Sequence, residues 1–291
     1  MLRCLLFCFS FTLLVSLHLI EKLTMKIRFM SLASGSSGNC YYLGTDTYGF
    51  LIDAGIGIRT IKKRLKDVGV PMENIVAVFV THDHADHIKS VGVLGENLFL
   101  PIYATSLTHV GINKSYCMTQ KLGISAKKLE KYQPLKIRDF TIESFEVPHD
   151  GTDNVGYCFE ADGKVFCFIT DLGEITPTVE KYIVKANYLI IESNYDAEML
   201  RMGPYPPYLK ERIAGHTGHM CNTDTAEFLA THFKSQLHYI WLCHLSKDNN
   251  HPDLAYKTVE LRLKQAGIIV GKDVELCTLK RSMPTELYTF E

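Results

Sequence analysis

The stretch from Thr81 to His87 contains the residues of this chain best suited to bind metal ions. Within six positions it carries three histidines and two aspartates, namely His82, Asp83, His84, Asp86 and His87. Neutral imidazole nitrogens and ionised carboxylate oxygens are ligands of divalent transition metals. The alternatives are a solvated polar loop or a helix N-cap formed by Asp86, and they leave the clustering of three histidines unexplained. The stretch therefore predicts a metal site.

The flanking residues indicate how these ligands are positioned. An apolar run at 77–80 precedes them and is typical of a buried strand, whereas Ile88, Val91 and Leu94 follow with helical spacing. The histidines would thus occupy a strand-to-helix turn. On such a turn His82 and His84 can face one metal, while Asp86 and His87 begin the helix and face a second.

Other single aspartates and histidines follow apolar strands elsewhere in the chain, namely Asp53, His149, Asp171 and His244. Alternating and apolar runs predict strands at 27–32, 40–43, 49–53, 141–147, 157–160, 164–170, 188–193, 237–243 and 274–279. A hairpin is expected at Asp162-Gly163. Helices are predicted at 58–68, at 225–233 with Asn222 or Thr223 as cap, and at 252–266. A sheet scaffold can gather the four strand-end residues beside the histidine turn.

Composition limits the class of protein. A hydrophobic content of 46% is enough for a large core, and a net charge of −1 means that nucleic-acid binding needs a local basic surface. The nine cysteines form no CxxC pair, which favours reduced, buried thiols and a cytoplasmic protein.

The first 24 residues differ from the rest. Residues 4–20 are almost wholly apolar, like the core of a signal peptide, but no small-x-small cleavage site follows and the run is short for a bilayer span. We expect residues 1–24 to be an upstream extension, with translation beginning at Met25; a membrane anchor or export signal is the alternative. Residues 25–291 are expected to form one hydrolase domain, without a stable membrane partner unless the leader is retained.

In order along the chain, Asp53, the run at 81–87, His149, Asp171 and His244 resemble the five successive motifs of the metallo-β-lactamase superfamily. The resemblance spans residues 25–291 and implies an α/β fold, a four-layer αβ/βα sandwich of two mixed β-sheets with helices outside. It also implies two metal ions. His82, His84 and His149 would hold the first, Asp86, His87 and His244 the second, and Asp171 would bridge both. Asp53 would orient a ligand histidine by accepting its other N–H.

Two neighbouring divalent ions can activate water and stabilise the attacking and leaving oxygens, so the ligand set predicts hydrolysis. Zinc suits nitrogen-rich ligation, and manganese and iron are the alternatives because the second site has harder ligands. Asp171 stands where zinc-sulfur β-lactamases have cysteine, which disfavours lactam cleavage.

Two further segments narrow the resemblance to the bacterial YycJ/WalJ group. They are residues 31–40, reading SLASGSSGNC, and 218–222, reading GHMCN; residues 192–196 also look like that group. Met220 and Cys221 replace its usual Leu and Ser. The resemblance implies 5′ to 3′ exonuclease activity on DNA. The rivals are a small-molecule hydrolase, either a cyclic phosphodiesterase or a glyoxalase-II-like thioesterase, and a non-catalytic metal-bound scaffold.

Candidate substrate-binding residues come from the same segments, namely Ser36, Ser37, Asn39, His219 and Asn222. A serine- and glycine-rich turn can bind phosphate, although a tight hairpin turn explains the same residues. His219 is a candidate proton donor with Asp86 as the other candidate catalytic residue; His216 is an alternative, as is a capping or core role for His219.

A basic stretch gives modest support for a nucleic-acid partner. It contains Lys114, Lys121, Lys127, Lys128, Lys131, Lys136 and Arg138, with Tyr116 and Tyr132 available to stack on bases. A solvated surface is the other interpretation of such a charge run.

Overall fold

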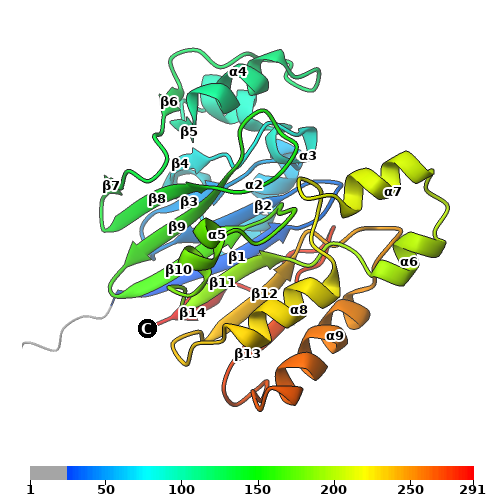
Figure 1. The fold of residues 1–291 in the computed structure, drawn as a ribbon. Helices are drawn as coiled ribbons and strands as arrows, with labels where there is room; N and C mark the ends of the chain where they lie inside the picture. Colours follow the sequence, from blue (N-terminus) through cyan, green and yellow to red (C-terminus); the bar gives the residue numbers. More distant parts are fainter. Residues whose placement is uncertain (1–24) are drawn as a thin grey trace, which may run out of the picture.

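A computed structural model describes residues 25–291, and the prediction for the leader at 1–24 lies outside these residues. Two seven-stranded sheets pack face to face with helices on their outer faces (Figure 1). None of the helices in the described residues is both long and apolar enough to cross a bilayer.

The first sheet has the strand order β14-β1-β2-β3-β4-β5-β6. Its strands are β1 (Ile27–Ala33), β2 (Cys40–Gly44), β3 (Gly49–Ile52), β4 (Ile75–Phe79), β5 (Ile102–Ala104), β6 (Ala126–Lys128) and β14 (Tyr288–Phe290). Pairing is antiparallel from β14 to β3 and parallel from β3 to β6. The sheet is therefore mixed, as predicted.

The second sheet has the order β13-β12-β11-β10-β9-β8-β7. Its strands are β7 (Leu135–Ile137), β8 (Phe140–Glu146), β9 (Val155–Ala161), β10 (Lys164–Ile169), β11 (Tyr188–Glu192), β12 (Tyr239–Cys243) and β13 (Glu275–Thr278). The hairpin between β9 and β10 turns at Asp162 and Gly163, both with positive φ, which confirms the predicted position. From β10 to β13 the strands run parallel.

Alternation along the strands builds the layers. Phe50 and Ile52 of β3 enter the core between the sheets, whereas Leu51 faces the helices outside. In β11, Ile190 points into the same central core and Ile191 points outward. Each sheet is thus apolar on both faces and must be covered on both. This confirms the predicted four-layer sandwich.

The helices are α2 (Ile58–Asp67), α3 (Ala85–Ile88), α4 (Ser106–Lys114), α5 (Pro177–Ile183), α6 (Ala197–Met202), α7 (Pro207–Ala214), α8 (Asn222–Thr231) and α9 (Pro252–Gln265), with a 3-10 turn η1 (Met72–Asn74) and a π-helical turn η2 (Val93–Asn97). Ile61 and Leu65 of α2 pack on the first sheet, and Leu229 of α8 and Val259 of α9 pack on the second. The predicted cap of the helix at 225–233 was wrong. The helix begins earlier, and the Cys221 side chain accepts from the Asp224 N–H.

Candidate metal centre

The histidine turn directly follows β4, at the carboxyl end of this strand of the first sheet. His82 and His87 are buried and His84 is partly exposed. The short helix α3 has His84 as its N-cap residue, without a side-chain capping bond, so Asp86 does not cap the helix. The alternative interpretation of Asp86 as a helix N-cap is therefore wrong.

Residues from both sheets meet at this turn. Donor atoms lying within 4.8 Å of one another form four overlapping groups. These are His82, His84 and His149; Asp86, His87 and His244; His82, His87 and Asp171; and Asp171, Glu192, His219 and His244. All seven predicted metal ligands appear in these groups, and the first two groups match the predicted division between two ions.

The distances describe a compact cluster. His149 Nε2 lies 3.3 Å from His84 Nδ1, and His244 Nε2 lies 3.4 Å from Asp86 Oδ2. Asp171 stands between the two sets, with Oδ2 3.2 Å from His87 Nε2 and Oδ1 3.6 Å from His149 Nε2. Metal–nitrogen and metal–oxygen bonds of about 2.0–2.2 Å require ligand atoms at such separations.

Two buried atoms at the centre of the cluster test whether these residues fit metal ions. Within the described part of the chain, His82 Nε2 and Asp171 Oδ2 have no hydrogen-bond partner. A buried polar atom without a partner costs free energy. A metal ion in contact with both groups would satisfy them, and the surrounding nitrogen and carboxylate donors suit divalent metals. The residues therefore fit the expected pair of ions.

Asp53 is fully buried behind the histidine turn and adopts a left-handed backbone, with φ of 56°. Its Oδ2 accepts a hydrogen bond from His87 Nδ1 at 2.7 Å, and its Oδ1 accepts from the Thr81 N–H at 2.8 Å. Because a carboxylate can only accept, His87 Nδ1 carries a proton, so Nε2 is the nitrogen through which His87 would bind a metal ion.

Glu192 is a site residue to which the sequence analysis gave no role. It ends β11, is fully buried, and its Oε1 accepts from His219 Nδ1 at 2.7 Å and from His244 Nδ1 at 2.8 Å. Its Oε2 accepts from the N–H groups of Leu172 and Met220. Its sequence signal is the one that singled out Asp53 and Asp171, a carboxylate at the end of an apolar strand.

Asp150 is a second residue that the sequence analysis missed. Its Oδ1 lies 3.4 Å from His84 Nε2, and its Oδ2 accepts from Arg212 Nε of α7 at 2.6 Å. Asp150 follows His149 directly, so the spacing of the two residues was the available signal.

Charge balance in the cluster shifts several pKa values. Burial disfavours the charged form of His244, but Asp171, Asp86 and Glu192 outweigh burial and raise the pKa to about 10. Burial is likewise outweighed at His87, whose pKa is raised well above 6.5 by Asp171, Asp53 and Asp86. By contrast, burial and the neighbouring His87 hold the pKa of His82 well below 6.5.

The predicted substrate-binding residues differ in their exposure to solvent. Ser36 and Ser37 are exposed at the tip of the turn after β1, and His219 is partly exposed beside the cluster. Asn39 is buried, with Nδ2 2.9 Å from His87 Nε2. Asn222 is fully buried, accepts from Ser193 Oγ and donates to Asn250 Oδ1. Its side chain is therefore not open to a substrate in this structure.

Two other predicted features lie apart from the cluster. His216 is exposed and contacts Glu174, with Nδ1 and Oε2 2.8 Å apart, rather than the predicted ligands. The basic stretch includes β6 and β7, the edge strands of the two sheets, and there Lys131 pairs with Asp153 and Lys128 with Glu130. Lysines on edge strands also block unwanted pairing with other strands.

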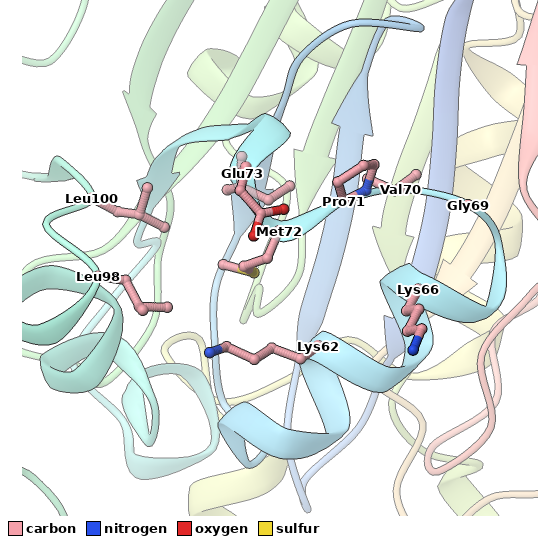
Figure 2. A pocket seen from close by; sticks show the side chains of 10 residues that line it. Lys62, Lys66, Gly69, Val70, Pro71, Met72, Glu73, Leu98 and Leu100 are labelled. Carbon is pink, nitrogen blue, oxygen red and sulfur yellow. The ribbon is translucent and has the colours of Figure 1, made fainter.

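A cavity of about 630 Å³ lies between α2, η1 and the segment after η2 (Figure 2). Its lining is largely apolar, with Lys62, Lys66 and Glu73 as its charged side chains. It contains no histidine, cysteine or aspartate, so it is not a second metal site.

Comparison with known proteins agrees with this geometry. A family model described as a beta-lactamase superfamily domain matches residues 48–240. Exodeoxyribonuclease YycJ of Bacillus anthracis is 35% identical over 266 residues, covering 90% of this chain and 99% of that protein. Exodeoxyribonuclease WalJ of Streptococcus pneumoniae serotype 2 is 36% identical over 250 residues, covering 86% and 93%.

Among solved structures, the metallo-β-lactamase fold protein YhfI of Bacillus subtilis superposes with a TM-score of 0.66 at 18% identity, covering 91% of this chain and 100% of that one. The chain therefore belongs to the metallo-β-lactamase superfamily of metal-dependent hydrolases, in its YycJ/WalJ group.

Proposed function

We propose that this protein is a dinuclear metal-dependent phosphodiester hydrolase that acts as a 5′ to 3′ exonuclease on DNA. The convergence of seven histidine and aspartate ligands from both sheets carries the proposal. The exodeoxyribonucleases that match it over nearly their whole length support the choice of DNA.

Each ion has a proposed ligand set. His82, His84 and His149 would hold the first, Asp86, His87 and His244 would hold the second, and Asp171 would contact both. Zinc is the proposed metal because imidazole nitrogens dominate, with manganese and iron as alternatives. When bound, the two ions supply Lewis-acid activation of water and of the phosphodiester.

The protein's own residues orient this chemistry. Asp53 accepts a hydrogen bond from His87 Nδ1, so that Nε2 would face an ion, and Glu192 does the same for His244. His149 Nδ1 donates to the Gly218 carbonyl at 2.9 Å, which leaves its Nε2 for the first ion. Asp86 is proposed to act in catalysis as well as ligation.

His219 is the proposed proton donor to the leaving oxygen. Burial opposes its charge, but Glu192 outweighs burial and raises its pKa above 6.5, which favours the protonated ring that a proton donor needs. Its Nδ1 is engaged by Glu192, which leaves Nε2 for the substrate. Ser36 and Ser37 are proposed to bind phosphate. Asn39 is better assigned to positioning Asp86 and His87, which its amide contacts.

We propose a cytoplasmic location on the chemistry of the thiols. Every cysteine in residues 25–291 is free, and most are buried. Free thiols persist in reducing compartments.

The experiment is digestion of 5′-labelled single- and double-stranded DNA and RNA by protein with measured metal content. The proposal expects metal-dependent release of the 5′ label from DNA as mononucleotide. Cleavage of a cyclic nucleotide or a thioester with intact DNA would move the assignment to a small-molecule hydrolase. Metal binding without hydrolysis of any of these would indicate a scaffold.

A further inference from the structure

The turn between β1 and β2 borders the candidate metal centre on its His244 side. Ser34 Oγ accepts a hydrogen bond from the His244 N–H at 2.9 Å. At the other end of the turn, Asn39 Nδ2 contacts Asp86 Oδ2 at 3.3 Å. Between these two anchors, the side chains of Ser36 and Ser37 are exposed. The two exposed serines therefore belong to a turn whose two ends contact residues of the cluster.

Arg281 reaches the same turn from the other end of the chain. It lies in the segment that joins β13 of the second sheet to β14 of the first. A Cβ atom on Gly35 would lie only 2.7 Å from Arg281 Cγ and 3.2 Å from the Leu245 carbonyl oxygen. Glycine at position 35 thus leaves room for the arginine stem to cross the turn. The guanidinium is held there by Nη1, which donates to the Ser246 carbonyl at 2.9 Å.

The charge of Arg281 is unpaired within the part of the chain that the structure describes. No carboxylate in residues 25–291 forms an ion pair with it, whereas Arg212 pairs with Asp150 and Arg262 with Glu227. Lys247, next to Ser246 in the chain, is also exposed and is not in any ion pair of the described residues. The acid beside it, Asp248, accepts a hydrogen bond from the Tyr205 hydroxyl at 2.7 Å. Arg281 thus brings a positive charge to the turn that carries the exposed serines, and Lys247 adds a second one next in the chain to the residue that holds Arg281.

We propose that Arg281, Ser36, Ser37 and Lys247 form a subsite for a phosphate of the nucleic-acid backbone next to the one held at the metal centre. This inference rests on the proposed function. A guanidinium binds phosphate oxygens through two parallel N–H groups, and serine hydroxyls donate to the same oxygens. The subsite would hold the strand in register while the phosphodiester at the cluster is cleaved.

The test is binding of a fluorescent single-stranded DNA with phosphorothioate linkages, which resists cleavage, to the full-length metal-loaded protein at several salt concentrations. Arg281→Gln is expected to weaken binding about tenfold at low salt. The slope of log K against log salt should also become shallower by about 1, the change expected when one phosphate contact is lost. Lys272→Gln is the control, because this exposed lysine precedes β13 whereas Arg281 follows it. Equal affinity and slope in the two variants would overturn the proposal.

A second variant, Ser37→Glu, tests the subsite without removing the Arg281 side chain, whose loss could unfold the turn. Ser37 is exposed, so the added carboxylate leaves the Arg281 stem in place and repels phosphate; binding should fall at least fivefold. Unchanged binding in this variant would also overturn the subsite.

Hydrolysis of bis(p-nitrophenyl) phosphate by the unmodified protein distinguishes a wrong phosphate subsite from a wrong proposed function. That substrate has a single phosphate and does not use the subsite. If it is hydrolysed while Arg281→Gln binds DNA as the unmodified protein does, the subsite is wrong and the proposed function stands. If it is not hydrolysed and DNA is not cleaved, the proposed function is wrong, and the binding comparison still decides whether the phosphate subsite exists.

Discussion

Each sheet contributes one half of the candidate metal centre. In both halves a buried carboxylate orients histidines, but the number of histidines differs. In the first sheet, Asp53 directly follows β3, is fully buried, and orients one histidine, His87. In the second sheet, Glu192 ends β11, is equally buried, and orients two histidines, His219 and His244. A buried carboxylate at a strand end thus fixes imidazole tautomers on each side of the cluster. Of these two carboxylates, Glu192 is the one that joins a proposed metal ligand to the proposed proton donor.

The largest effect is expected from Asp171, which belongs to both halves. Asp171→Asn removes the charge that lies between His87 and His149. If this removes about 4 kcal/mol of transition-state stabilisation, the rate falls about a thousandfold. Metal analysis should show loss of bound ions in parallel. Full activity with full metal content would contradict the bridging role.

Metal binding is expected to be steeply pH-dependent. His87 in one half and His244 in the other have raised pKa values, about 10 for His244, so both carry protons at pH 7 that an entering ion displaces. Affinity should therefore rise with pH from 6 to 8, by up to about a hundredfold per unit if two protons leave. Calorimetry in buffers of different ionisation enthalpy measures the proton count. Binding without proton release would contradict this charge state.

The same raised values set the direction of the stability change in the absence of ions. A histidine with a raised folded pKa stabilises the fold fully below its unfolded pKa of about 6.5. For His244 this contribution is lost as the pH rises through about 10. Bound ions should reverse the trend, because they favour the neutral ligands.

Glu192→Gln and Asp53→Asn sharpen the comparison between the halves. Each replaces an acceptor-only carboxylate by an amide of the same shape, and such changes typically cost about 10–100-fold in metal affinity or activity. We expect excess metal to restore most activity in Asp53→Asn, because His87 serves only the metal. It should not restore Glu192→Gln, because His219 also loses its partner. Equal rescue of both variants would remove the distinction between the halves.

The smallest effect is expected at His219. His219→Ala should leave metal content unchanged and lower turnover at least tenfold, consistent with loss of a general acid. The reduction should be smaller for a substrate with a p-nitrophenolate leaving group, which does not need protonation. Unchanged turnover on DNA would reject His219 as the proton donor, and His216→Ala is the matched control because its ring lies outside the cluster.

Local sequence signals predicted most of the scaffold. Strong apolar strands such as β10, β11 and β12 fall where alternation and β-branched content indicated, because burial on both faces enforces that pattern. The edge strands β6 and β7 were not predicted. They are three residues long and rich in lysine, so pairing with a neighbouring strand defines them rather than local pattern.

The site residues also fall into two classes, those that a sequence pattern indicated and those whose role depends on the fold. Histidines within six positions of one another form a local sequence pattern. The ends of apolar strands indicated His149, Asp171 and His244, and the family resemblance supplied their proposed roles as metal ligands. Glu192 could not be assigned a role, because its function depends on two histidines that the fold brings to it from other segments. The amide of Asn222 could in principle bind phosphate. In the fold, however, the side chain is buried and its hydrogen bonds go to Ser193 and Asn250.

The most direct test of the central claim is an anomalous-scattering map of crystals grown with zinc or manganese. The account predicts two peaks, one within the His82, His84 and His149 group and one within the Asp86, His87 and His244 group, with Asp171 in contact with both. A single peak, or peaks away from these residues, would contradict a centre shared between the two sheets.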